Sequence, residues 1–168
     1  MSSPKPRSSA LDALDYKILA ALHRDGRMSK TKMSVEVGLS ATRCWERMRR
    51  LEQEGFIRGY HADIDMKRLA GLTYFVVQVR LLGSSVARAR QFERLVANVN
   101  EIVGCQAVLG TVDYFLTIAA DGVDSYQRII EDLSNQDAVK FEFVTFPISK
   151  TLKTAYSVPL TATLSPRA

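Results

Sequence analysis

Apolar residues in the first part of the chain recur at the spacing of one face of an α-helix. From residue 11 to residue 22 they stand at Leu11, Leu14, Ile18, Leu19 and Leu22. Asp12 is a residue type that caps a helix start, and Asp25-Gly26 is a typical helix stop. The pattern predicts one amphipathic supporting helix.

A helix-turn-helix is predicted over residues 29–55. Its turn is Val37-Gly38-Leu39, and Ser40 is placed to cap the helix that follows. Apolar residues recur on one face of each helix, at Met33 and Val37 in the first and at Cys44, Met48 and Leu51 in the second. The alternation in Phe56–His61 predicts a short strand, so residues 11–61 are expected to form a winged helix-turn-helix.

Arginines fill the helix face beside this second apolar stripe. Arg43, Arg47 and Arg50 form a row about 100° around the helix axis from it. A solvated surface would carry the same residues, and Glu46 with Arg50 is a favourable intrahelical pair. The start of the second helix of a helix-turn-helix, however, is the part that enters the major groove of DNA. The row therefore favours a DNA-reading helix from about Ser40.

The position of each residue in this unit predicts its contact with double-stranded DNA. Base-edge contacts are assigned to Ala41, Thr42, Arg43 and Glu46, and phosphate or mixed contacts to Arg47, Arg49 and Arg50. Ser29, Lys30, Lys32 and Ser40 complete the set at the two helix starts, where lysines and free backbone amides meet phosphates. Trp45 is expected to pack rather than to stack on bases.

From Leu72 onward the apolar residues alternate, as in a strand with one buried face. The pattern predicts strands over 72–81, 103–109, 114–120 and 139–146, and helices over 86–99 and 124–133. This β-α-β-β-α-β order is that of the ferredoxin-like fold, an α+β arrangement with both helices on one face of a four-stranded antiparallel sheet. Residues 62–71 are expected to be a linker that contains one helical turn.

The other face of this sheet is predicted to be uncovered. It carries apolar residues, Val76 and Val144 among them. An exposed apolar patch larger than a few hundred Å² is unusual on a soluble monomer, so we expect a second copy of the chain to cover it. The segment after Pro147 is typical of an additional edge strand.

Charge separates the two parts of the chain. The 168 residues carry a net charge of +5, with 12 Lys and Arg against 7 Asp and Glu in residues 1–61, but 11 against 11 in residues 62–168. An excess of positive charge in the first part alone is expected when only that part meets a polyanion. Charge and motif thus point to the same unit.

The two cysteines and the apolar pattern of the chain argue against metal-binding, disulfide-bonded, exported and membrane-spanning proteins. Cys44 and Cys105 lack the spacing of a zinc site or a disulfide framework, so we expect two small core residues, no metal and no cofactor. Neither an export leader nor a run of about 20 apolar residues is present, which predicts a cytoplasmic protein. Residues 1–10 and 159–168 are expected to be tails.

Two blocks of sequence closely resemble a known family. LDALDYKILAALHRDGRMSK and VGLSATRCWERMRRLEQEGFIRGYHA are similar to the N-terminal domain of the Lrp/AsnC family, the feast/famine transcriptional regulators of bacteria and archaea. The likeness continues to about Val158 through GTVDYFL, which resembles the family's Gly-x-x-Asp-Tyr turn. The resemblance implies a winged helix-turn-helix joined to a ligand-binding domain over 72–158. It also implies dimers that pair through their sheets and assemble into tetramers or octamers, with an effector, usually an amino acid, bound where dimers meet.

The turn at Gly110–Asp113 is the candidate effector site. Glycine leaves backbone N–H groups open to a carboxylate, Thr111 adds a hydroxyl, and Asp113 is able to accept from an α-ammonium group. A plain hairpin turn would use the same residue types. The candidate effector set is Leu109, Gly110, Thr111, Val112, Asp113, Tyr114 and Phe146.

Two other functions are alternatives to a DNA-binding regulator. Siroheme decarboxylases resemble this architecture and are enzymes, but His23 and His61, the only histidines, both lie outside the predicted ferredoxin-like domain. No Ser/His/Asp or Cys/His set can be drawn within one unit, which counts against catalysis. An amino-acid-sensing module without DNA binding is the second alternative, and the arginine row counts against it.

Overall fold

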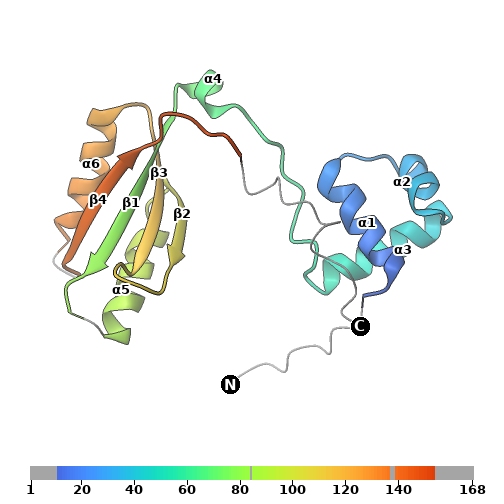
Figure 1. Cartoon of the computed structure of the whole chain (residues 1–168), viewed down its shortest axis with the longest axis horizontal. Helices are drawn as coiled ribbons and strands as arrows, with labels where there is room; N and C mark the ends of the chain where they lie inside the picture. The colour runs from blue at the N-terminus through green and yellow to red at the C-terminus, as the bar shows by residue number, and fades with distance from the viewer. Residues whose placement is uncertain (1–10, 84, 137–138, 154–168) are drawn as a thin grey trace. The chain divides into compact units, whose positions relative to one another are not determined.

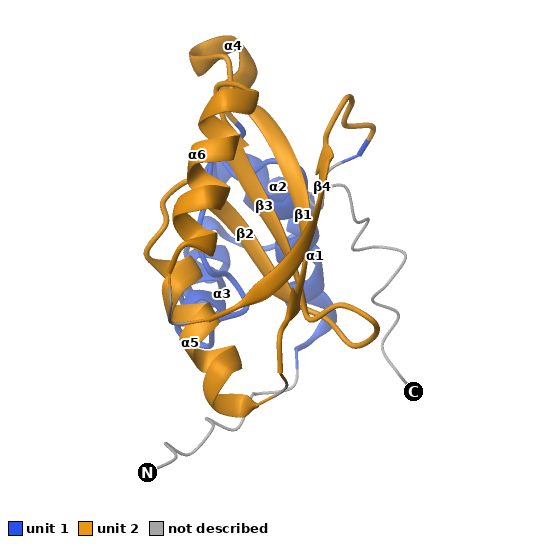
Figure 2. Ribbon diagram, turned by 90° about the vertical axis from the view of Figure 1, so that its left-hand side faces the viewer, with its two compact units in different colours: residues 1–63, 153–168 blue, residues 64–152 orange. Residues whose placement is uncertain are grey.

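The computed structural model describes residues 11–83, 85–136 and 139–153 (Figure 1). The chain divides into two compact units, residues 1–63 with 153–168 and residues 64–152 (Figure 2). Each unit has a hydrophobic core of its own.

Three helices make up the described part of the first unit: α1 (Ala13–Arg24), α2 (Lys30–Val37) and α3 (Ala41–Gln53). The carboxylate of Asp12 accepts from the Asp15 N–H, and that of Asp15 accepts from the Asp12 N–H, so the two form a capping box at the start of α1. Ser29 and Ser40 cap α2 and α3. Gly38 ends α2 with φ 77°, a conformation that glycine adopts without strain. The predicted helix-turn-helix is confirmed.

The apolar stripes predicted from the sequence meet in the core of this unit. Its buried members come from all three helices: Ile18, Ala21, Met33, Val37, Cys44 and Leu51. Fully burying one large aliphatic side chain of this kind stabilises a fold by about 1.5–3 kcal/mol. The shared core holds α3 on a packed scaffold.

Residues 56–61 do not form the predicted strand. Gly55 is left-handed with φ 77°, and the N–H groups of Phe56 and Ile57 both donate to the carbonyl of Leu51, at 2.9 and 3.1 Å. The segment therefore closes the end of α3 instead of running away from it. A ladder also needs a neighbouring strand, and the described residues of this unit contain none.

A short helix, α4 (Met66–Ala70), lies in the predicted linker. Asp65 caps it by accepting from the N–H of Arg68 at 2.9 Å, and Gly71 ends it with φ 67°. The helical turn expected between residues 62 and 71 is confirmed.

The second unit continues with β1 (Thr73–Leu81), α5 (Val86–Ala97), β2 (Ile102–Ala107), β3 (Tyr114–Ala120), α6 (Val123–Ser134) and β4 (Phe141–Pro147). The sheet order is β2-β3-β1-β4 with every neighbouring pair antiparallel, which confirms the ferredoxin-like prediction. β4 starts two residues later than predicted because Val139, although buried, lies before the paired residues. Val139 is apolar because it is buried, not because it belongs to a strand.

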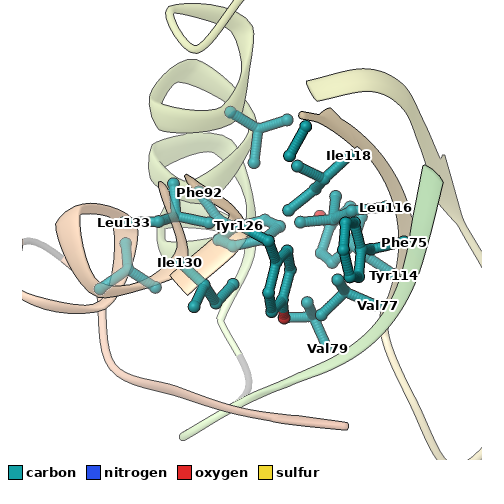
Figure 3. Packing of buried hydrophobic residues seen from close by; sticks show 13 residues of the cluster. Phe75, Val77, Val79, Phe92, Tyr114, Leu116, Ile118, Tyr126, Ile130 and Leu133 are labelled. Carbon is teal, nitrogen blue, oxygen red and sulfur yellow. The ribbon is translucent and has the colours of Figure 1, made fainter. Parts of the chain in front are cut away.

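The core of the second unit lies between the sheet and its two helices. Phe75, Val77 and Val79 point inward from β1 and meet Phe92 of α5 and Tyr126 of α6 (Figure 3). The rings of Phe75 and Tyr126 stack with centroids 4.4 Å apart. Both helices therefore cover one face of the sheet, as predicted.

The other sheet face is open in the single chain. In register across β1 and β4 it pairs Val76 with Phe146, Gln78 with Val144, and Arg80 with Glu142. Val144 is 54% exposed and Phe146 is 48% exposed. The apolar face inferred from the sequence is thus present.

The segment after Pro147 begins by extending the sheet, since the N–H of Ile148 donates to the carbonyl of Tyr74 at 2.8 Å. The rest of the predicted edge strand, beyond residue 153, lies outside the described residues. Among the helices that the structure describes, none is long and apolar enough to cross a membrane.

Candidate DNA-reading helix and effector site

The arginine row on α3 divides into paired and free side chains. Arg47 donates through Nη1 to Asp12 Oδ2 at 2.7 Å and to Asp15 Oδ1 at 2.8 Å, and Arg50 donates to Asp15 Oδ2. Asp15 has no exposed side-chain surface, so these pairs anchor α3 to α1 from inside the unit. The structure thus gives Arg47 and Arg50 an internal partner, and their predicted phosphate contacts stay a prediction.

Hydrogen bonds within this network favour the charged form of Asp12. The backbone N–H of Asp15 and the guanidinium of Arg47 hold the pKa of Asp12 below its ordinary value. The same two hydrogen-bonded carboxylates raise the pKa of Arg47. α3 is therefore fixed to α1 by ion pairs as well as by apolar packing.

Asp15 was not predicted from the sequence as the anchor of α3. It lies in the turn of α1 that carries Leu14 and Ile18, and a carboxylate beside core positions is costly unless it is paired. A carboxylate beside core positions of α1, together with the row of arginines in a later helix, could have predicted this pairing from the sequence.

The remaining predicted contacts are on the surface of α3 and at the start of α2. Thr42, Glu46 and Arg49 are exposed and stand four and three residues apart, so they form one stripe along α3. Among the described residues, neither Arg43 nor Arg49 has a carboxylate partner. Arg49 therefore places an unpaired positive charge on this stripe, and Arg43 places a second one beside it.

The residues at the two helix starts have mixed roles. The hydroxyls of Ser29 and Ser40 accept from the N–H groups of Lys32 and Arg43, at 3.2 and 3.3 Å, so both serve as caps. The Lys32 ammonium lies 3.6 Å from the Asp25 carboxylate, in an exposed pair. Such a pair is weak, which leaves Lys32 available to a phosphate. Ala41 is exposed at the first position of α3.

An open hollow of about 460 Å³ lies on the bare sheet face beside the turn between β2 and β3. Two of the predicted effector residues, Thr111 and Val112, line it together with Gln78, Arg80, Glu142, Phe143 and Val144. Gly110 precedes them with φ 151°, which residues with a side chain rarely adopt. The glycine-led turn therefore borders a concave surface.

The other predicted effector residues lie elsewhere. Asp113 Oδ2 accepts from the N–H of Leu81 at 2.7 Å, and its own N–H donates to Val79, so it joins the turn to β1. Tyr114 is buried on the helix side of the sheet and donates to Glu93 at 3.1 Å. Burial and this carboxylate raise its pKa to about 12. Leu109 is fully exposed, and Phe146 lies four residues along β4 from Glu142.

Arg80 and Glu142 were not predicted from the sequence. Arg80 donates to Glu142 Oε2 through Nη2 at 2.5 Å and through Nε at 3.1 Å, across paired positions of β1 and β4. The hollow thus offers both signs of charge side by side. Their 62-residue separation hid this pair, since only the strand register brings them together.

The cysteines and histidines form no site among the described residues. Cys44 is buried, as expected, and burial raises the pKa of its thiol. Cys105 was expected in the core but is exposed, because β2 is an edge strand with β3 as its one neighbour. In the part of the chain that the structure describes, no group of three His, Cys, Asp or Glu residues is placed to hold a metal ion.

Comparison with known proteins identifies both units. Residues 11–58 match the model for winged helix-turn-helix DNA-binding domains, and residues 74–158 match the model for the Lrp/AsnC ligand binding domain. The transcriptional regulatory protein DoeX of Halomonas elongata is 39% identical over 143 residues, which cover 85% of this chain and 90% of that protein. The leucine-responsive regulatory protein of Haemophilus influenzae is 35% identical over 126 residues, which cover 75% of this chain and 76% of that protein.

Comparison with solved structures also finds transcriptional regulators. The crystal structure of a transcriptional regulator from Neisseria meningitidis in complex with L-Met matches with a TM-score of 0.83 and 26% identity, covering 92% of this chain and 100% of that one. The two domain models occur in the same order as the two units described above. On this combined likeness, the chain belongs to the Lrp/AsnC family of transcriptional regulators.

Proposed function

We propose that this chain regulates transcription by reading double-stranded DNA with α3, and that an amino acid or a related metabolite bound at the hollow beside Arg80 and Glu142 modulates it. Membership of a family of regulators, with a DNA-binding and a ligand-binding domain, supports the general role. The exposed stripe of Thr42, Glu46 and Arg49 beside the capped start of α3 carries the DNA-reading half.

The charges of the first unit support this assignment. Its paired arginines fix the orientation of α3, while Arg43 and Arg49 project cations that no described carboxylate neutralises. Arginine near the start of a recognition helix reaches base edges, and arginine further along meets phosphates. We therefore assign Arg43 to a base edge and Arg49 to a phosphate.

Replacing each free arginine by alanine is expected to give a different loss of DNA binding. Arg43→Ala should reduce discrimination between the preferred and altered base pair by about 1–3 kcal/mol, because a base-edge contact is lost. Arg49→Ala should weaken all sequences alike and lower the salt dependence, log K against log salt, by about one unit. Gel-shift titrations on the DNA upstream of the chain's own gene, at several salt concentrations, measure both.

Arg128→Ala is the matched control for this experiment. Arg128 is an exposed arginine of α6, in the second unit, so its removal lowers the net charge equally without touching the reading helix. It should bind DNA nearly as the unaltered chain does. Unchanged discrimination and unchanged salt dependence in both α3 variants would contradict the assignment.

The hollow of the second unit contains charged groups of both signs, which suit an amino-acid ligand. A zwitterion presents a carboxylate and an ammonium group, and the hollow holds Arg80 and Glu142 side by side. We propose that the ligand exchanges their mutual pair for two of its own, with its carboxylate on the Arg80 guanidinium and its ammonium group on Glu142. Thr111 adds a hydroxyl, and Val144 adds apolar surface for the ligand side chain. The relative from Neisseria meningitidis was solved as a complex with L-Met, which belongs to this chemical class.

Calorimetry with the twenty amino acids is expected to find at least one that binds the unaltered chain and binds Arg80→Gln about 10- to 100-fold more weakly. A hydrogen bond to a charged group contributes about 1.5–3 kcal/mol, which corresponds to that range. Arg128→Gln, the same change on α6, should bind normally. If none of the twenty bound, or if Arg80→Gln bound like the unaltered chain, the hollow would not be an amino-acid site.

We also propose a homodimer formed through the open sheet faces, with assembly into tetramers or octamers as the family resemblance implies. The half-exposed apolar side chains of Val144 and Phe146 support such pairing. A ligand changes an equilibrium only when it binds two states with different affinity. A hollow on the pairing face would supply that difference, because a second copy would complete or close it.

A further inference from the structure

Trp45, the only tryptophan of the chain, is not part of the core of the first unit. The sequence predicted that it packs, but its side chain belongs to α3 and is left 41% exposed. A substantial part of this large aromatic ring is therefore not packed against the core of its own unit. Its surface is therefore available to a partner.

The ring is occupied on one side by a lysine. The Nζ atom of Lys30, the first residue of α2, lies 4.5 Å from the centroid of the Trp45 ring. This is the geometry of a cation–π contact, which holds a cation in place without neutralising it. Among the described residues Lys30 has no carboxylate partner, so its positive charge remains available.

The pair is continuous with the exposed stripe of α3. Trp45 stands three residues after Thr42 and four residues before Arg49, and residues at those spacings are neighbours on a helix surface. α2 and α3 are adjacent helices of the unit, so Lys30 adds a cation at the edge of the same surface. An apolar ring and a positioned ammonium group thus lie beside the residues assigned to DNA.

We propose that Trp45 and Lys30 form one two-part DNA contact, in which the indole ring packs against the 5-methyl group of a thymine in the major groove and the ammonium group of Lys30 meets the neighbouring phosphate. The thymine methyl group is the apolar feature that a protein contacts in that groove. A phosphate accepts the charge that the ring holds in position. The inference rests on DNA reading by α3 and adds a preference for thymine at one position of each half-site.

The test uses a duplex that the unaltered chain selects from a random pool, with each thymine replaced in turn by deoxyuridine, which lacks only the methyl group. The unaltered chain should lose about fourfold in affinity at one position per half-site, the factor that corresponds to one buried methyl group. Trp45→Ala should bind the thymine and deoxyuridine duplexes equally. Lys30→Gln should keep the methyl preference but lower the salt dependence by about one unit.

Tryptophan emission gives an independent measurement, because Trp45 is its only source. Saturating DNA should change the intensity or the emission maximum in the full chain. Thermal unfolding of Trp45→Ala checks that the variant is folded, and Trp45→Phe should recover part of the methyl preference. Equal methyl sensitivity with and without Trp45, or an unchanged emission on binding, would overturn the proposal. Failure of the unaltered chain to select any DNA would instead overturn the DNA-reading assignment itself.

Discussion

Replacing Asp15 by alanine is expected to destabilise the helix-turn-helix unit by about 3–5 kcal/mol, the usual effect of removing one partner from a buried ion pair. The change removes the carboxylate that pairs with Arg50 and one of the two that pair with Arg47, and it removes one half of the capping box with Asp12. Small domains have a total stability of only about 5–15 kcal/mol. Denaturant titration followed by the emission of Trp45, which lies in this unit, measures the loss.

Asp25→Ala is the matched control at the other end of α1. Its carboxylate lies 3.6 Å from the Lys32 ammonium group, and both side chains are exposed. Pairs of this kind contribute about 0–1 kcal/mol, so its unfolding midpoint should move far less than that of Asp15→Ala. Equal midpoints for the two variants would show that the buried carboxylate does not hold the helices together.

Replacing Val76 by glutamate is expected to raise the dissociation constant of self-association at least a hundredfold, about 2.7 kcal/mol. Val76 lies on the open face of the sheet, where it pairs with Thr117 of β3 and with Phe146 of β4. A carboxylate that is buried between two sheets without a positive partner costs several kcal/mol, and Arg80, an arginine on the same face of β1, is already paired with Glu142. Sedimentation velocity over a range of concentrations measures the change.

Val123→Glu introduces the same charge on a different surface. Val123 is 59% exposed at the first position of α6, where an acidic side chain is favourable for the helix. This variant should sediment like the unaltered chain. If Val76→Glu did so too, the copies would have to pair through another surface than the open sheet face.

The periodicity of apolar residues was sufficient to predict both units. Met33, Val37, Cys44 and Leu51 follow helical spacing and are buried together, because one helix face packs against one core. Phe75, Val77 and Val79 alternate and point to one side of the sheet for the equivalent reason in strands. The caps at Asp12 and Ser40 were predictable because a cap acts within four residues of sequence.

Contacts between distant segments could not be predicted in the same way. The pairing of Arg47 with Asp15 depends on how α3 lies against α1, and that of Arg80 with Glu142 depends on the register of β1 and β4. The periodicity of apolar residues gives no information about helix packing or strand register. It also cannot distinguish an exposed ring from a packed one, which is why Trp45 was assigned to packing. The strand predicted at residues 56–61 failed because alternation does not say whether a partner strand is present.

The two ends of β1 have different neighbours. Thr73 follows α4 and so lies at the end toward the linker, whereas Arg80 borders the hollow at the other end. Seven residues of strand separate them by about 23 Å. β1 is hydrogen-bonded to β3 on one side and to β4 on the other, so it cannot shift along its axis without breaking two ladders. If an effector binds in the hollow and a second copy faces the sheet, as proposed above, the effector acts more directly on the contact between the two copies than on the linker of its own chain.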